Sequence, residues 1–557
     1  MAGRISPCAM RVLGFAATSL VAVILLAAKA DEGDAVERKV ELPASQLDYL
    51  PESMDASALS TTRGKTYGYP PVVKKKYRHD EIFYEGADQI WQPYMEFENE
   101  YGRVGVSTQG DPVRTKGHPF FTPAKDGNGR ACVTCHQPRD GMGLSLDTIQ
   151  RLWKESNGKA PLFDVWDGAN CPDVEQGKPE SHSLLLERGL IRIARPWPPR
   201  DFAGNPIEPE FDIEVVQDPT GCNRSPKYGL NGENQQISVY RRPRPVANLR
   251  YLETPRVDRN AKTMQPMDRD PVTRARSSMS MMADARVTSL RMQNENALHE
   301  HMQSTIGWTQ EQLDELLEFQ RKIHVAAAYS NGAGDLDEPG GPKGLGINSI
   351  VTGTSHMSGT DLDTGTFFLM DQWRPGGEKA GKNAAQREFR ASVVRGYDLF
   401  FLKPFYISET RGITDIRLGS PFKQTCGFCH NTQLTGHDNV PGWMDIGTQN
   451  FPETMHADKS HVLPMFKVTC KASARPHPYL GRTIYTRDPG RALVSGKCAD
   501  VGNVVMQQFR GIAARPPYYI NGSAKTLRDM IDFYDRRYKI GYTEQEKTDL
   551  VNFFSVL

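Results

Sequence analysis

Two short segments of the chain hold the residues best suited to chemistry. Both have the order Cys-x-x-Cys-His, one from Cys132 to His136 and the other from Cys426 to His430. This pattern is typical of c-type haem attachment, because two thiols three positions apart can reach two vinyl groups of one porphyrin. The imidazole that follows then lies under the iron. The pattern predicts haem attachment at Cys132, Cys135, Cys426 and Cys429, and metal ligation by His136 and His430.

Chance, a zinc site and a redox-active dithiol account for the two motifs less well. With 9 Cys and 13 His in 557 residues, chance gives roughly 0.003 matches to the pattern. A shared zinc site would require two segments roughly 300 residues apart to converge, whereas structural zinc ligands usually cluster in sequence. A thioredoxin-like dithiol explains neither the adjacent His nor the duplication. We therefore expect two covalently bound haem c groups.

Four of the remaining cysteines form two local groups. Cys171 and Cys222 lie between the motifs, and Cys470 and Cys498 follow the second one. In an oxidising compartment such cysteines are usually paired, so we expect a disulfide within each group. Free thiols and cross pairings are the alternatives, since spacing alone does not fix connectivity.

The N-terminus resembles a secretory signal peptide over residues 1–30. Arg4 and Arg11 precede an apolar run at 12–28, and an A-x-A cleavage site follows at 28–30. An uncleaved anchor is the alternative, because about 17 apolar residues approach the length that spans a bilayer. We expect cleavage, no stable membrane span in the mature chain, and a periplasmic or secreted protein.

The composition indicates an ordinary globular protein. Hydrophobic residues make up 38% of the chain, and 68 Lys and Arg balance 67 Asp and Glu. Nucleic-acid binding would need a strongly basic face, so no such partner is expected. The length is sufficient for two or three domains.

Amphipathic helices are predicted around both motifs. They cover 144–153, 282–302, 309–328, 390–401 and 526–537, with a last helix that begins at the capping box of Thr543 and Glu546. The expected fold class is mainly α, with two cytochrome c-like haem domains and a long irregular insertion in the first. The expected divisions are a signal peptide at 1–30, an N-terminal extension at 31–85, a first haem domain at 86–330 with its insertion at about 158–241, a linker at 331–385 and a second haem domain at 386–557.

Several stretches near the motifs carry a family resemblance. They include DPGRAL from Asp488, FRGIAARPPYYINGS at 509–523, TLRDMIDFY at 526–534, RPVANL at 244–249 and MADARVTSLRMQ at 282–293. On these stretches, in regions that cover roughly half of the mature chain, the sequence resembles the bacterial di-haem cytochrome c peroxidase superfamily. That superfamily includes MauG and, more distantly, the rubber oxygenases.

The resemblance also implies roles for individual residues. Tyr534 matches the position of the second haem's distal ligand, which is Met in peroxidases and Tyr in MauG; Met530 and His437 are the alternatives. A phenolate ligand stabilises ferric iron, whereas Met raises the potential. The first haem is expected to be open, because no His lies between His136 and His182.

Departures from the family concern the predicted catalytic residues. Gln293 matches a family Gln, but the position of the distal acid falls at Gln303. An amide cannot carry the peroxide proton, so Glu300, or one of its neighbours His299 and His301, would have to do so. Three further positions differ from the family pattern: Ala283 replaces the Trp between the haems, Ile520 replaces a His, and Pro243 at the position of an Asn ligand makes a calcium site doubtful.

These observations predict an exported di-haem c-type oxidoreductase of the peroxidase type. It would reduce hydrogen peroxide at the first haem, with electrons from a small periplasmic cytochrome c or cupredoxin relayed through the second. One alternative is MauG-like or rubber-oxygenase-like oxidation of a partner or an organic substrate, with peroxide or dioxygen. The other alternative is a pure electron-transfer di-haem cytochrome.

Overall fold

The structure is a computed structural model. It describes residues 81–201, 204–253, 256–257, 266–267, 277–352, 369–415, 419–430, 443–450 and 461–557. The predicted signal peptide and His437 lie outside these ranges, as does most of the N-terminal extension. Apart from Val257 and Pro266, the described residues belong to one compact unit. None of the helices in these ranges is long and apolar enough to cross a membrane. The predicted division into domains remains a prediction.

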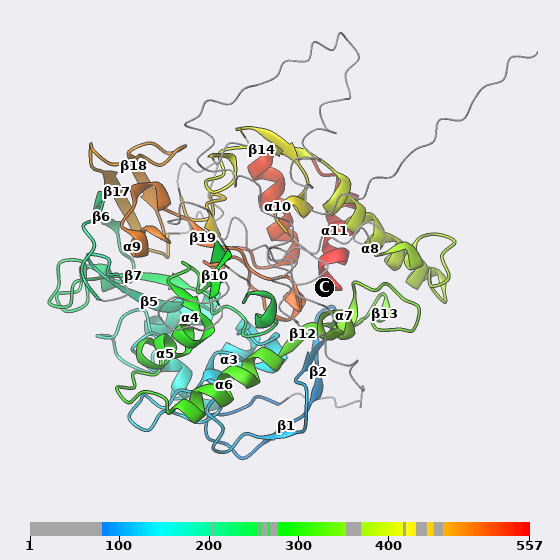
Figure 1. The fold of residues 1–557 in the computed structure, drawn as a ribbon, viewed down its shortest axis with the longest axis horizontal. Coiled ribbons are helices and arrows are strands. Elements are labelled where there is room, and N and C mark those ends of the chain that lie inside the picture. Colours follow the sequence, from blue (N-terminus) through cyan, green and yellow to red (C-terminus); the bar gives the residue numbers. More distant parts are fainter. Residues whose placement is uncertain are drawn as a thin grey trace, which may run out of the picture. The chain divides into compact units, whose positions relative to one another are not determined.

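The expectation of a mainly α fold with two cytochrome c-like haem domains is wrong. The chain has 31% helix and 19% strand arranged in many small sheets, which makes it a mixed α/β fold. Strands occupy segments that the helical periodicity did not cover, before the first motif, inside the insertion and after the second motif (Figure 1). Their short alternating apolar runs bury one face in a sheet instead of forming a helix.

The largest sheet precedes and follows the first motif. Its order is β13-β12-β3-β2, with antiparallel neighbours. The strands are β2 (Tyr94–Asn99), β3 (Gly102–Ser107), β12 (His324–Ser330) and β13 (Gly334–Asp335). The helix predicted over 309–328 therefore ends early, because Val325 pairs with Val106 of β3 and both side chains enter the core. Helix α6 (Gln310–Lys322) begins at a capping box of Thr309 and Gln312.

The insertion is built largely of strands. Within it, β5 (Ile191–Pro196) pairs with β7 (Gln236–Arg241). Strand β6 (Phe211–Gln217) instead pairs with β17 (Met465–Cys470), which in turn pairs with β18 (Thr483–Thr486). Figure 1 shows β6 beside β17 and β18, although they are far apart in the sequence. The insertion is thus joined by hydrogen bonds to a segment that follows the second motif.

Both predicted local disulfides are confirmed. Cys171 is bonded to Cys222, with the two Cα atoms 5.2 Å apart. Cys470 is bonded to Cys498, with the two Cα atoms 5.7 Å apart. Each bond closes a loop of the lobe that contains β5, β6, β7 and β17. Cys470 and Cys498 lie in one buried apolar cluster with residues of these strands.

Three helices form the helical part that follows the linker region. They are α8 (Ala384–Leu402), α10 (Leu527–Tyr538) and α11 (Glu544–Ser555), and α11 packs on both of the others. The predicted capping box at the start of α11 is confirmed, and α10 also begins at a capping box, formed by Thr526 and Asp529. Gly396 permits close packing of α8, because a Cβ atom there would lie 2.1 Å from the carbonyl oxygen of Asp549 in α11.

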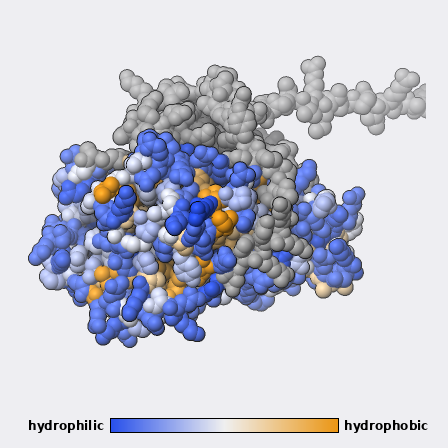
Figure 2. Space-filling model, turned by 90° about the horizontal axis from the view of Figure 1, so that it is seen from below, coloured by the Kyte–Doolittle hydropathy of each residue, from blue (hydrophilic) through white to orange (hydrophobic). Residues whose placement is uncertain are grey.

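Shorter elements complete the described chain. The remaining helices are α3 (Leu146–Ser156), α4 (Ser183–Arg188), α5 (Leu290–Glu300), α7 (Gly346–Thr352) and α9 (Ala492–Ser495). The remaining strand pairs are β1 (Ile90–Trp91) with β4 (Val113–Arg114), β8 (Arg256–Val257) with β9 (Pro266–Met267), β10 (Ser277–Met281) with β11 (Val287–Ser289), β14 (Phe405–Ile407) with β15 (Phe422–Gln424), and β16 (Trp443–Met444) with β19 (Val504–Val505). Hydrophilic residues cover most of the face in Figure 2, with apolar surface in a few small groups.

Candidate functional site

The first Cys-x-x-Cys-His motif forms a short 3-10 turn at Cys132–Thr134. The hydroxyl oxygen of Thr134 accepts a hydrogen bond from the amide of Ala131 at 3.0 Å, and the amide of Cys135 donates to the carbonyl of Cys132 at 3.3 Å. The side chain of Val133 is buried in the core beside β3. The turn is therefore held by hydrogen bonds among its own residues and by the packing of Val133 against the sheet.

The cysteines of this first turn are held as neutral thiols. Neither of them forms a disulfide. Burial raises the pKa of Cys132 to about 12 and the pKa of Cys135 to about 11. Since the thiolate is the reactive form of cysteine, the turn does not have the chemistry of a thioredoxin-like dithiol.

A tight loop fixes the imidazole of His136. After the turn the chain folds back so that the amide of Gln137 bonds to the carbonyl of Gly143 at 2.9 Å. Met142 adopts a left-handed φ of 62° in this loop, and its carbonyl oxygen lies 3.2 Å from Nδ1 of His136. A carbonyl can only accept, so Nδ1 carries the proton and Nε2 keeps its lone pair. Burial lowers the pKa of His136 to about 4, which keeps the ring neutral.

The second motif repeats this turn at Cys426–Phe428. The amide of His430 donates to the carbonyl of Cys426 at 3.2 Å. The sulfur of Cys426 lies 3.9 Å from the hydroxyl of Tyr542, and burial raises the pKa of this thiol to about 11. The ring of His430 lies against Phe509, with 4.6 Å between centroids and an interplanar angle of 30°.

Tyr534 lies at the second turn, as the resemblance implied. It packs with Cys426 and Cys429 against one apolar cluster, and its ring stacks on Tyr538 with 6.3 Å between centroids. Burial raises the pKa of Tyr534 well above its ordinary value, so the side chain is a neutral phenol. Its predicted role as a ligand remains a prediction, as does that of Met530, which is buried in a neighbouring cluster.

One segment, Phe509–Arg515, contacts both turns. At its start, Phe509 lies on the ring of His430. At its other end it meets the loop that holds Met142: a Cβ atom on Gly141 would lie 3.2 Å from the carbonyl oxygen of Gly511 and 3.3 Å from Nη1 of Arg515. The two motifs are therefore connected through a continuous stretch of packed chain.

Glu300, a predicted catalytic residue, is fully engaged in ion pairs. One carboxylate oxygen lies 2.9 Å from Nη1 of Arg195 and the other 2.8 Å from Nη2 of Arg286. Burial alone would raise the pKa of Glu300, but the two guanidinium groups outweigh it and lower the pKa to about 2. The carboxylate stays ionised at neutral pH, which makes it a poor carrier of protons.

The ion pairs of Glu300 continue into a buried network. Asp284 lies 2.6 Å from Arg241 and 3.0 Å from Arg286, and Arg241 also pairs with Asp488 at 2.7 Å. Asp488 opens the stretch DPGRAL that carried part of the resemblance. The network explains why that stretch is charged although it is buried.

The two predicted glutamines lie on or next to α5. Gln293 is half-buried in the helix, about two turns before Glu300. Gln303 follows the helix in a left-handed conformation, φ 56°, and its amide oxygen accepts from Asn128 at 3.1 Å. The structure therefore brings Gln303 and Glu300 to the same end of α5, and it places Gln293 farther along. Their catalytic roles remain predictions.

Asp167 and Arg130 were not recognised from the sequence. Asp167 lies in the insertion, where no pattern distinguishes it, and its carboxylate accepts from Nδ1 of His301 at 2.7 Å. The other oxygen of Asp167 is paired with Arg130, which stands two residues before the first turn. Only a long-range contact between the insertion and the motif brings these residues together.

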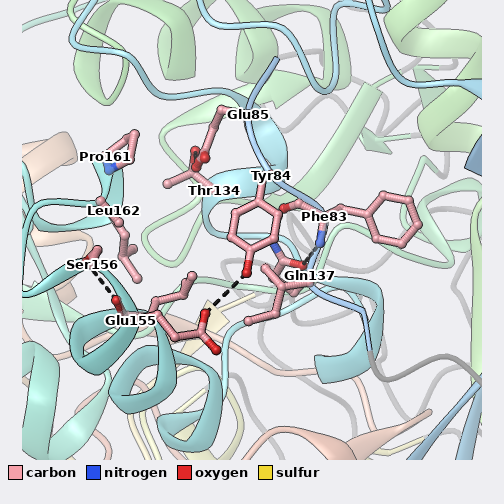
Figure 3. A pocket seen from close by; sticks show the side chains of 12 residues that line it. Phe83, Tyr84, Glu85, Thr134, Gln137, Glu155, Ser156, Pro161 and Leu162 are labelled. Carbon is pink, nitrogen blue, oxygen red and sulfur yellow. Dashed lines mark hydrogen bonds between the residues drawn. The ribbon is translucent and has the colours of Figure 1, made fainter. Parts of the chain in front are cut away.

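A cavity of about 260 Å³ opens beside the first turn (Figure 3). Thr134 and Gln137 of the motif region line it, together with residues 82–85 and parts of α3. The hydroxyl of Thr134 donates to the carboxylate of Glu85 at 2.5 Å, and burial raises the pKa of Glu85. At the opposite side, Tyr84 donates to Glu155 at 3.2 Å. The cavity provides an approach to the turn from the side of α3.

The residues at the motifs do not fit the metal groups that were expected. A metal ion held by side chains needs several donor atoms that converge on one point. Among the described residues, no group of three or more His, Cys, Asp and Glu could hold a metal ion. On this finding the cofactor prediction, two covalently bound haem c groups with a doubtful calcium, is wrong. The cysteines and histidines of the two turns remain candidate functional residues.

Comparison with known proteins adds no relative. No family model, no curated protein and no solved structure matches this chain.

Proposed function

We propose that the protein is an exported oxidoreductase of the peroxidase type. It reduces hydrogen peroxide at the first Cys-x-x-Cys-His turn, with electrons from a small periplasmic redox protein relayed through the second turn. One observation carries the proposal: the same turn is built twice from cysteines outside disulfides, while the other four cysteines of the described chain are paired. In an exported protein, adjacent cysteines left out of disulfides serve another purpose.

The state of the turns argues against a reactive role for three of their sulfur atoms. The raised pKa values of Cys132, Cys135 and Cys426 suppress the thiolate form that would attack peroxide or exchange disulfides. The imidazole of His136, by contrast, is neutral and presents the lone pair of Nε2. The first turn therefore offers two neutral thiols and an imidazole nitrogen with a lone pair.

The relay between the turns is supported by the segment Phe509–Arg515. Its first residue lies on His430, and its later residues pack against the loop that fixes His136. This contact gives the two turns a short connection through packed groups. The resemblance of the same stretch to the peroxidase superfamily agrees with a shared role in both sites.

A second candidate function is oxidation of a partner protein or an organic substrate. Three tyrosine rings favour it: Tyr534 at the second turn lies 6.3 Å from Tyr538 and 6.5 Å from Tyr519 between centroids. Such a chain of phenols could carry one-electron oxidation away from the turn. A variant Tyr534→Phe would then lose oxidation of the partner while peroxide is still consumed at the first turn.

The test uses full-length protein exported to an oxidising compartment. Mass spectrometry of the two peptides that contain the motifs would identify any group that the four sulfur atoms carry. Peroxide consumption would then be followed with a reduced small cytochrome c or cupredoxin as the electron donor. Wild-type protein should consume one peroxide for every two electrons taken from the donor.

Paired variants separate the roles of the turns. The double change Cys132→Ala with Cys135→Ala should abolish peroxide consumption. The matched change Cys426→Ala with Cys429→Ala should abolish steady turnover with the donor, because the relay is lost. Wild-type protein that accepts electrons but never consumes peroxide would instead identify an electron carrier and defeat the proposal.

A further inference from the structure

We infer that His301, oriented by Asp167, is the residue that transfers the proton during reduction of peroxide at the first turn. This role rests on the proposed function and names the acid–base group within it. Asp167 and Arg130 are positioning residues that act through His301.

The imidazole of His301 is held from two sides. The residue directly follows the last residue of α5, and its Nδ1 lies 2.7 Å from Oδ2 of Asp167. The carboxylate of Asp167 is buried and is also paired with Arg130. The carbonyl of His301 accepts from Asn128 at 3.1 Å and from Arg130 at 3.4 Å. Backbone and ring are therefore both fixed, as a preorganised proton carrier requires.

Arg130 connects this pair to the first turn. It stands two residues before Cys132, and its guanidinium group also donates to the carbonyl groups of Pro161 and Leu162 at 2.8 and 2.9 Å. His301 is close enough to His136 that a positive charge on His301 lowers the pKa of His136. The pair thus lies at the turn where peroxide is proposed to react.

The protonation state leaves one ring nitrogen of His301 able to accept a proton. An ionised carboxylate can only accept, so Nδ1 of His301 carries the proton and Nε2 keeps its lone pair. Burial is the main cause that lowers the pKa of His301 to about 4, so the ring is neutral at physiological pH. The side chain is 24% exposed, which leaves the ring accessible to a small molecule. The charged groups that face it are Glu300, Arg286, Arg130, Arg195 and Asp167.

The two neighbouring candidates are less suitable. Glu300 is engaged by Arg195 and Arg286 and stays ionised. His299 is exposed, and its Nδ1 lies 2.7 Å from the carbonyl of Ser304. Of the three titratable residues in this helical turn, only His301 combines an oriented ring with a carboxylate partner beside the first motif.

The proposed step balances. Two electrons from the donor redox protein enter the O–O bond as it breaks, while Nε2 of His301 accepts the proton from one oxygen of hydrogen peroxide and returns it to the other, which leaves as water. The first oxygen, now carrying the two electrons, takes two protons from solvent and leaves as a second water. His301 is unchanged at the end of the cycle, and the sum is one peroxide, two electrons and two protons to two waters.

The experiment compares His301→Gln with the matched control His299→Gln, which changes the same residue type two positions earlier. Steady-state peroxide reduction is measured from pH 5 to pH 8 with a reduced small cytochrome c as donor. Loss of a general acid–base group should lower kcat/KM by about 10²- to 10⁴-fold in His301→Gln. The control should stay within two-fold of the wild-type protein. Asp167→Asn should give an intermediate loss with an altered pH profile.

Two readouts separate this role from a merely structural one. Added imidazole should restore part of the activity of His301→Ala, because the ring position is partly exposed. Nitrogen-15 NMR of histidine-labelled wild-type protein should show His301 neutral and protonated on Nδ1 at pH 7. Absence of peroxide turnover in wild-type protein would defeat both the function and this role. Turnover that is unchanged in His301→Gln, or a His301 imidazolium at pH 7, would defeat this role alone.

Discussion

The buried ion-pair network beside the first turn gives a sharp prediction for stability. In the variant Asp284→Asn the side chain keeps its shape and loses its charge. Asp284 is fully buried between Arg241, at 2.6 Å, and Arg286, at 3.0 Å. Removing one partner of a buried ion pair typically costs about 3–5 kcal/mol. Because Arg241 keeps Asp488 and Arg286 keeps Glu300, we expect the lower end, about 3 kcal/mol.

The assay is urea unfolding of full-length protein, followed by circular dichroism. The change in the free energy of unfolding is the change in midpoint multiplied by the common slope. The matched control is Glu214→Gln, which removes an exposed pair with Lys467 at 3.0 Å. An exposed pair is worth about 0–1 kcal/mol, so this control should hardly move. If Asp284→Asn and Glu214→Gln both lost the same small amount of unfolding free energy, the charge of Asp284 would not stabilise the network, and the prediction would be refuted.

The stability lost in Asp284→Asn should depend on pH in a way that follows from the direction of the pKa shift of Asp284. Burial alone would raise the pKa of Asp284, but Arg286 and Arg241 hold it far below its ordinary value. A depressed carboxylate contributes stability that is present above the ordinary pKa of about 4 and is lost as pH falls toward the native value. The difference between Asp284→Asn and wild-type protein should therefore stay constant from pH 8 to pH 5. A deficit that disappears near pH 6 would contradict the assignment.

Three further predictions concern separate parts of the fold. Cys222→Ala opens a disulfide that spans 51 residues, and the unfolding free energy should fall by about 4 kcal/mol, a difference that reductant should abolish. Gly396→Ala would place a Cβ atom 2.1 Å from the carbonyl of Asp549, so the melting temperature should drop, whereas Gly307→Ala, with open space around it, should have a smaller effect. His118 is buried and its pKa is lowered to about 4, so it contributes stability above its ordinary pKa of about 6.5 that is lost as pH falls toward 4. His118→Gln should flatten the fall in unfolding free energy over that range by about 1.4 kcal/mol per pH unit, and an unchanged slope would contradict the assignment.

Local signals in the sequence predicted local structure well. The capping boxes that begin α6, α10 and α11 depend on residues three positions apart, and all three are present in the structure. Each disulfide joins two cysteines that follow one another in the chain when the motif cysteines are left out. The capping boxes are decided within four residues, whereas the disulfides span 51 and 28 residues and were predicted from the order of the cysteines.

Long-range pairing explains the failures. Residues 325–328 continue the helical pattern of α6, but β3 offers backbone partners and a buried face, so they form β12. Likewise, the helix expected from residue 282 begins only at Leu290, because Val287–Ser289 pairs as β11 and Ser289 caps the helix. Propensity is a weak determinant where tertiary contacts compete with it. The mainly α expectation failed at these points.

The insertion supplies much of the environment of the first turn. Residues 158–241 include Asp167, which orients His301, and Arg195, which holds Glu300. Its last strand ends at Arg241, the centre of the buried network, and its strand β6 pairs with β17 beyond the second turn. Charged groups from the insertion therefore set the protonation of residues that the motif pattern alone would have assigned to catalysis. It follows that an insertion without any recognisable motif orients His301 and pairs with the charge of Glu300, the two titratable side chains at the end of α5 that face it.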